Sequence, residues 1–347
     1  MKASEKVTGI SFTYNPTGEY DMVHELGIKW MRLLIYFPWK DKMFGELRQK
    51  YLDAKQEIID THAKGFEIMT VSIGMGVYIY NEEVGENQWL DFWPDFVGEK
   101  GTEEYYENVR KTMEFICRDL GESAGIYWQV ANEIENPIFA KEYSDEIVAN
   151  TARAAAEGIM KANPNARCGI NIAGYCDRAL EICDILYREG HQFYYCGVDQ
   201  YFGSWHEGDV DDWEDVINAL YDRYKLPVLV CEWGYSGGGE FSETPPDPAE
   251  VPFGMPDVCH YQKWFNQVEG GHTSETQADY LRRGLKLFAE NPHCIGSFIF
   301  CWRDAYHCYH CHGTTCPSEC YWGLVTADCV PKPAYYAVKE TLEKYYK

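Results

Sequence analysis

Two short apolar runs in the sequence each end on a glutamate. The run over 126–131 ends in Asn132 and Glu133, and the run over 226–231 ends in Glu232. Apolar runs of this length are typical of buried strands. Burying a carboxylate beside one costs free energy or shifts the pKa of the acid. We therefore expect the two acids to face each other across one cleft, where they serve a chemical purpose.

Paired carboxyl groups are what cleavage of a glycosidic bond needs. One acid protonates the leaving oxygen, while the other attacks the anomeric carbon or activates water. The two groups must differ in pKa, so their surroundings must differ as well. Glu133 and Glu232 are the candidate pair.

The elements that would position these acids alternate between strand and helix. Parallel strands joined by helical crossovers give this pattern, and eight units favour a single (β/α)8 TIM barrel over 1–347. No G-x-G-x-x-G follows the first strand, which disfavours a dinucleotide-binding fold. Two long connections, 81–100 and 236–273, are expected as loops. The expected strands are 7–14, 29–36, 66–73, 126–131, 167–173, 196–201, 227–232 and 294–302, and the expected helices are 45–64, 102–120, 144–162, 177–189, 211–224, 274–290 and 333–345.

The active site of such a barrel lies at the C-terminal ends of its strands. Besides the acids, these ends carry Arg32, Tyr201 and Trp302. A guanidinium and a phenol beside one acid would keep it ionised as a nucleophile. Surroundings that exclude water would keep the other acid protonated. The indole offers an apolar face to a sugar ring.

With these residues in place, the chain resembles the clan A retaining glycoside hydrolases, which are (β/α)8 barrels. Their fourth strand ends in Asn-Glu and their seventh in Glu, as at Asn132-Glu133 and Glu232. Arg32 lies in a Met-Arg-Leu-Leu setting on the second strand, and the segments 277–281 and 323–336 are also similar. The resemblance covers nearly the whole chain and identifies the clan, not one family within it.

The resemblance implies a role for each matched residue. Glu133 would be the general acid/base and Glu232 the nucleophile, with no cofactor for catalysis. Asn132 would bind the sugar 2-hydroxyl. Arg32 and Tyr201 match the clan's Arg and Tyr at those strand ends, and Trp302 matches its sugar platform. The third strand lacks the His or polar clusters of some families, so the identity of the sugar stays open.

A cysteine-rich loop, 303–323, follows the eighth expected strand. Cys308, Cys311, Cys316 and Cys320 have the spacing C-x2-C-x4-C-x3-C, which suits a closed structural zinc site. Its histidines at 307, 310 and 312 are alternative ligands. Free thiols, disulfides and an iron–sulfur cluster are the other interpretations.

The charge and composition narrow the classes of partner. A net charge of −24 disfavours nucleic acid and anionic membranes and favours a neutral oligosaccharide. No run is long enough to span a bilayer. Fourteen cysteines, many of them in apolar strands, suit a reducing, cytoplasmic location. Assembly into a homo-oligomer is left open.

The leading interpretation is a retaining β-glycosidase that acts by double displacement, as an exo-enzyme on small oligosaccharides. The alternatives are a catalytically silent carbohydrate-binding barrel and an assembly module built on the zinc loop. A metal-dependent barrel hydrolase would need His and Asp ligands at the strand ends, which are scarce in this sequence.

Overall fold

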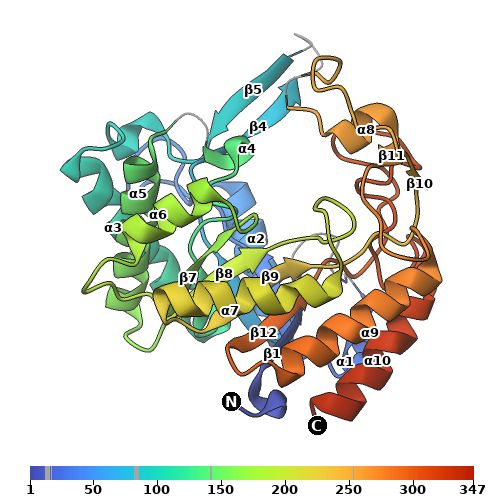
Figure 1. The fold of residues 1–347 in the computed structure, drawn as a ribbon. Helices are drawn as coiled ribbons and strands as arrows, with labels where there is room; N and C mark the ends of the chain where they lie inside the picture. The colour runs from blue at the N-terminus through green and yellow to red at the C-terminus, as the bar shows by residue number, and fades with distance from the viewer. Residues whose placement is uncertain (12–15, 17, 82–85, 141–142, 253) are drawn as a thin grey trace.

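The computed structural model describes residues 1–11, 16, 18–81, 86–140, 143–252 and 254–347. Within them, eight parallel strands close into a barrel in the order β1-β12-β9-β8-β7-β6-β3-β2 (Figure 1). This confirms the (β/α)8 prediction; positions 12–14 of the first expected strand lie outside the described residues. The barrel strands are β1 (Val7–Ile10), β2 (Trp30–Leu34), β3 (Glu67–Val71), β6 (Tyr127–Gln129), β7 (Arg167–Ile172), β8 (Tyr195–Asp199), β9 (Val228–Trp233) and β12 (Cys294–Ile299).

Helices cover the outside of the barrel (Figure 1). All seven expected helices are present, within a few residues at each end. The helices α1, α4 and α8 are additions, and α1 is capped by Gly27, which has φ 86°. None of the helices in the described part of the chain has the length and apolar character needed to cross a bilayer. The helices are α1 (Tyr20–Leu26), α2 (Gln49–Ala63), α3 (Glu103–Leu120), α4 (Pro137–Ala140), α5 (Asp145–Ala162), α6 (Asp177–Leu186), α7 (Trp213–Tyr224), α8 (Asp257–Tyr261), α9 (Ser274–Glu290) and α10 (Pro333–Tyr345), with 3-10 turns η1 (Ala3–Glu5), η2 (Asp95–Val97), η3 (Gly121–Ala124) and η4 (Val210–Asp212).

Hydroxyl side chains fix the starts of three long helices. Thr102, Ser144 and Thr273 precede α3, α5 and α9, and each side-chain oxygen accepts a hydrogen bond from the backbone N–H three residues later. Each cap satisfies a donor that the first helical turn leaves unpaired, and such a cap contributes about 1 kcal/mol.

The barrel interior has an apolar layer and, toward the C-terminal strand ends, a polar one. Side chains alternate along a strand, so every second residue points inward. The apolar layer includes Val7, Met69, Tyr127, Tyr195, Leu229 and Phe298, which pack together. Two residues after Tyr127 comes Gln129, and Arg32 follows the inward Trp30. On β7, Asn171 follows Gly169, whose Cα faces the Tyr195 ring in the apolar layer. The alternation therefore places polar side chains toward the C-terminal rim of the barrel.

Two additions rise above the strand ends (Figure 1). The connection after β3, of which 81–100 was expected to be a loop, contains two antiparallel strands, β4 (Gly76–Asn81) and β5 (Glu86–Asp91). Positions 82–85 lie outside the described residues. The long connection after β9 carries β10 (Glu240–Phe241), α8 and β11 (Lys263–Trp264). Figure 1 shows the β4–β5 pair and the α8 segment on opposite sides at the top of the barrel.

Helices α3 and α5 approach each other closely at Gly158. A Cβ atom at this position would lie 2.2 Å from the backbone oxygen of Arg110. We expect Gly158→Ala to lower the free energy of unfolding by about 1–3 kcal/mol, because backbone atoms must separate to admit the methyl group. Denaturant unfolding measures the change. Gly18→Ala is the control, since no described atom lies within 4 Å of its Cβ position; equal stability of the two variants would contradict the prediction.

Candidate active site

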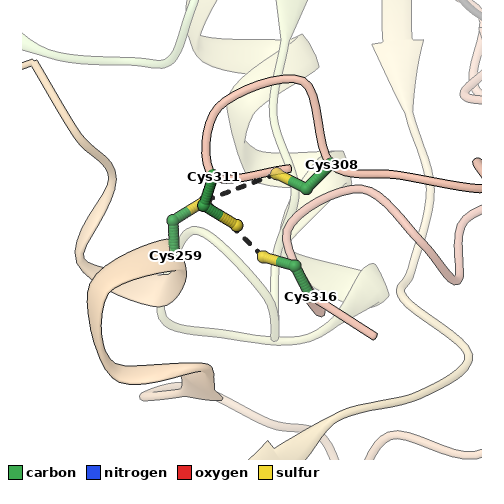
Figure 2. A group of neighbouring side chains, drawn as sticks. All are labelled: Cys259, Cys308, Cys311 and Cys316. Atoms are coloured by element: carbon green, nitrogen blue, oxygen red, sulfur yellow. Dashed lines mark hydrogen bonds between the residues drawn. The ribbon is translucent and has the colours of Figure 1, made fainter. Parts of the chain in front are cut away.

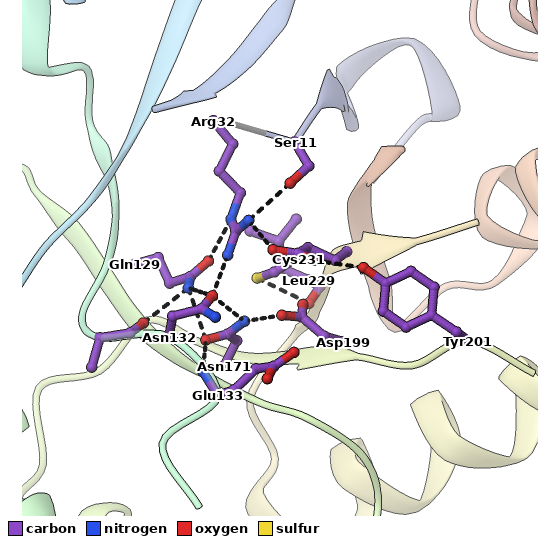
Figure 3. A network of polar contacts seen from close by, with 12 residues as sticks. Ser11, Arg32, Gln129, Asn132, Glu133, Asn171, Asp199, Tyr201, Leu229 and Cys231 are labelled. Atoms are coloured by element: carbon purple, nitrogen blue, oxygen red, sulfur yellow. Dashed lines mark hydrogen bonds and ion pairs between the residues drawn. The ribbon is translucent and has the colours of Figure 1, made fainter. Parts of the chain in front are cut away.

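Two side chains hold the carboxylate of Glu232 at the end of β9. Arg32 Nη1 donates to Oε1 at 2.5 Å, and the Tyr201 hydroxyl donates to Oε2 at 2.6 Å. Glu232 is only 6% exposed and Arg32 is fully buried. Arg32 lies on β2, Tyr201 follows β8 and Glu232 lies on β9, and the hydrogen bonds bring them together as their positions in the sequence suggested. Figure 3 shows Arg32 and Tyr201 directed toward the same region. These two donors fix the orientation of both oxygens of the Glu232 carboxyl group.

An irregularity in β9 turns Glu232 inward. Cys231 packs with the apolar layer inside the barrel, so strict alternation would point Glu232 outward. The register shifts at this point: Val198 pairs with Val230, but Asp199 pairs with Glu232. A bulge of this kind places two successive side chains on one side of a sheet and commonly re-aims a residue beside an active site.

Arg32 is the centre of a buried hydrogen-bond network (Figure 3). Besides Glu232, its guanidinium donates to Gln129 Oε1 at 2.7 Å, Asn132 Oδ1 at 2.6 Å and Ser11 Oγ at 3.0 Å. A buried guanidinium would cost several kcal/mol without such partners. The network also fixes Asn132, the residue expected to bind the sugar 2-hydroxyl, at the rim of the barrel.

Three polar residues of this network were not predicted from the sequence. Gln129 Nε2 donates to Asn171 Oδ1 at 2.8 Å and to Asn132 Oδ1 at 3.0 Å. Asn171 in turn donates to Asp199 Oδ2. Gln129, Asn171 and Asp199 each interrupt an otherwise apolar strand at an inward position. That interruption is the signal in the sequence that could have identified them.

A strained backbone conformation brings Glu133 into contact with Asn136 and Asn171. Ala131 and Glu133 have φ values of 69° and 43°, in the left-handed region that side chains other than glycine rarely adopt. The Glu133 N–H donates to Asn171 Oδ1 at 2.9 Å, and its Oε2 accepts from Asn136 Nδ2 at 2.7 Å. Such conformations cost about 1–3 kcal/mol each and concentrate at functional sites.

Three carboxyl groups converge next to Arg32. Glu133, Asp199 and Glu232 each offer an oxygen within 4.8 Å of the others. Burial and the charge of nearby Glu232 raise the pKa of Glu133 to about 8. Burial and Glu232 also raise the pKa of Asp199 well above its ordinary value. The site therefore holds a protonated Glu133 at neutral pH, facing a carboxylate that is paired with a guanidinium.

The eighth strand contributes a different aromatic residue from the one expected. Trp302 is fully buried and packs against Tyr335 of α10, with ring centroids 6.2 Å apart, so its face is not available to a sugar. Phe300, two residues earlier, is only partly buried and lies 5.8 Å from the Tyr201 ring. The strand therefore turns Trp302 toward the outer helices and Phe300 toward the site.

A pocket opens beside the acid. Its volume is about 380 Å³, and its lining includes Asn136, which donates to Glu133, together with Arg178, Gln200 and His206. These side chains can donate hydrogen bonds to hydroxyl groups. The pocket thus offers room for part of a polar ligand next to Glu133.

The cysteine-rich loop meets a cysteine from another loop (Figure 2). The Sγ atoms of Cys259, Cys308, Cys311 and Cys316 all lie within 4.8 Å of one another. Three of these thiols were expected as metal ligands. Cys320 packs beside the group but is not one of the four, and its Sγ lies 3.6 Å from the backbone oxygen of Gly313. Cys259 takes its place because α8 lies across the loop, a contact that spacing within 303–323 cannot reveal.

Comparison with known proteins shows the fold. No family model and no curated protein matches the sequence. A solved GH53 catalytic domain from Ignisphaera aggregans superposes with a TM-score of 0.64 at 18% identity, covering 98% of this chain and 96% of that one. A glucosidase from Croceicoccus marinus gives 0.62 at 12% identity, covering 99% and 69%. A Bacteroides uniformis β-glucuronidase gives 0.59 at 15%, covering 96% and 34%.

The raised pKa of Glu133 makes stability depend on pH. The folded protein keeps a proton up to about pH 8 that the unfolded chain releases near 4.5. The contribution of Glu133 to the free energy of unfolding is therefore fully present below pH 4.5 and is lost as pH rises through about 8. We expect Glu133→Gln to reduce the fall in the free energy of unfolding between about pH 5 and 9. Urea unfolding at each pH measures it, with the exposed Glu122→Gln as control; parallel pH curves for all three proteins would count against the raised pKa.

Proposed function

We propose that this protein is a retaining β-glycosidase of the clan A type, and that it acts through a covalent glycosyl-enzyme intermediate. The observation that carries the proposal is the contrast between the two glutamates. Glu232 lies between Arg32 and Tyr201, and Glu133 faces it with a pKa near 8. A carboxylate nucleophile and a protonated acid in one site are the two groups that the reaction requires.

The mechanism assigns one role to each acid. Glu232 attacks the anomeric carbon and forms an ester to the sugar, while Glu133 gives its proton to the departing oxygen. Glu133, now a carboxylate, then takes a proton from water. That water attacks the same carbon, and the ester bond to Glu232 breaks. Asn132, held by Arg32 and Gln129, is positioned to bind the sugar 2-hydroxyl.

The separation of the acids supports retention of configuration. Retaining enzymes place their carboxyl groups about 5–5.5 Å apart, whereas inverting enzymes leave about 6.5–9.5 Å to admit a water molecule. Oxygens of Glu133 and Glu232 lie within 4.8 Å of each other. So close an approach of the two acids favours the shorter, retaining separation.

A small oligosaccharide attacked at its end is the substrate class we favour. The net charge of −24 disfavours polyanions. Phe300, rather than Trp302, is placed to contact the apolar face of a sugar ring. Solved structures that share the fold include a glucosidase and β-glucuronidases. We place the enzyme in the cytoplasm, since none of the fourteen cysteines forms a disulfide, as a reducing compartment favours.

Two other functions are less well supported. A silent sugar-binding barrel would have no use for strained backbone at Glu133 or for an acid with a pKa near 8. A metal-dependent hydrolase could use Glu133, Asp199 and Glu232 as ligands. The guanidinium of Arg32 already binds Glu232, however, and its positive charge opposes a cation at the same place.

Removing the nucleophile tests the proposal directly. We expect Glu232→Gln to lower kcat for aryl β-glycosides by about 10⁴-fold or more, because a neutral amide cannot form the ester. A panel of nitrophenyl glycosides measures it, with Glu122→Gln as the matched control. NMR of the first-formed sugar should show the β-anomer. Formation of the α-anomer, or full activity of Glu232→Gln, would refute the retaining mechanism.

Removing the acid should give a loss that depends on the leaving group. We expect Glu133→Gln to lower kcat/KM by about 10²–10⁴-fold for glycosides with poor leaving groups. The loss should be far smaller for dinitrophenyl glycosides, which depart without a proton. In the unmodified enzyme, activity should fall as pH rises through about 8, where Glu133 loses its proton. An equal loss for both kinds of leaving group would assign Glu133 another role.

A further inference from the structure

The four thiols near α8 come from two loops that are distant in sequence. Cys259 lies in α8, in the connection after β9, whereas Cys308, Cys311 and Cys316 follow β12. Cys259, Cys308 and Cys316 are buried and Cys311 is partly buried. Figure 2 shows the side chains directed toward a common centre, with Cys259 approaching from the α8 side.

The separations between the sulfur atoms fit a tetrahedral metal site. Cys259 Sγ lies 3.6 Å from both Cys308 Sγ and Cys316 Sγ. Zinc–sulfur bonds of about 2.3 Å at tetrahedral angles place the sulfur atoms about 3.8 Å apart. Cys259 thus lies almost as far from Cys308 and from Cys316 as it would across a zinc ion, and all four sulfur atoms lie within 4.8 Å of one another.

Neighbouring groups support this arrangement. The chain turns tightly through the loop, where Cys308 N donates to Gly313 O at 2.9 Å and His312 N donates to Cys308 O at 2.8 Å. Gln262 Nε2 lies 3.6 Å from Cys311 Sγ and can donate to a thiolate there. Polar donors that surround ligating atoms orient the ligands and stabilise their charge.

We propose that Cys259, Cys308, Cys311 and Cys316 bind one structural zinc ion that fastens the connection after β9 to the loop after β12. Four thiolates complete a tetrahedral shell and leave no position for water, so the ion takes no part in catalysis. Cys320 is outside the shell. The site therefore joins two separate loops, instead of folding the cysteine-rich loop on itself.

The zinc site would also support one wall of the active site. Ser318, two residues after Cys316, accepts a hydrogen bond from Trp322 Nε1 at 2.7 Å. The Trp322 ring lies 5.1 Å from that of Tyr201, whose hydroxyl binds Glu232. Val258, next to Cys259, packs into the same aromatic cluster. Loss of the metal would loosen the packing behind Tyr201.

Metal analysis of three purified proteins tests the ligand set without any activity assay. We expect about one zinc per chain in the unmodified protein and in Cys320→Ser, and less than about 0.2 in Cys259→Ser. Circular dichroism reports whether each variant folds. If Cys259→Ser fails to fold, Cys259→His is the second variant; it should bind zinc, because imidazole is also a zinc ligand.

Cobalt substitution provides a second measurement on the unmodified protein. Cobalt bound to four thiolates in a tetrahedron should give strong sulfur-to-metal charge-transfer bands, which should weaken in Cys259→His. Several results would overturn the proposal: no metal in the unmodified protein, bound iron in place of zinc, or loss of zinc from Cys320→Ser with retention in Cys259→Ser. Each reading is independent of whether the protein cleaves glycosides.

Discussion

The active site depends on a single buried positive charge. Arg32 is fully buried, and its guanidinium reaches side chains from β6, β9 and the segments that follow β1 and β6. Burying this charge is expensive, and the hydrogen bonds and the ion pair with Glu232 offset that cost. The same contacts fix the positions of Glu232 and Asn132. The requirement to satisfy Arg32 therefore orders the residues that the proposed reaction uses.

Departures from regular backbone geometry determine where the two acidic side chains of the site point. Regular alternation would point Glu232 away from the barrel interior, and a regular strand end would not turn the chain at Ala131 and Glu133. The bulge in β9 and the two left-handed residues bring both acids to the same place. The regular hydrogen bonds of the barrel and the packing of the surrounding helices stabilise the fold and offset the free-energy cost of these strained positions.

The sequence predicted the barrel because apolar runs and helical spacing alternate clearly along the chain, and each strand forms within a few residues of its expected place. It also predicted that the two acids, Arg32 and Tyr201 would lie close together, because strand ends in this fold meet at one rim. It missed Gln129 and Asn171, because their role in the network depends on the side chains that they contact across the barrel. The prediction for Trp302 was wrong because Trp302 lies after the end of β12, where the path of the loop decides which way a side chain points. Cys259 was missed because its partners are about fifty residues away in the sequence.

The short gap between the two glutamates has a consequence for the progress of the proposed reaction. When Glu232 becomes an ester, it loses the negative charge that makes ionisation of Glu133 unfavourable, while Arg32 keeps its positive charge. Glu133 then becomes a stronger acid at the stage when it must hold no proton and accept one from water. Hydrolysis of the ester restores the charge on Glu232 and returns Glu133 to its weakly acidic state. Each turnover thus resets the proton donor through the charge that Glu232 loses and regains.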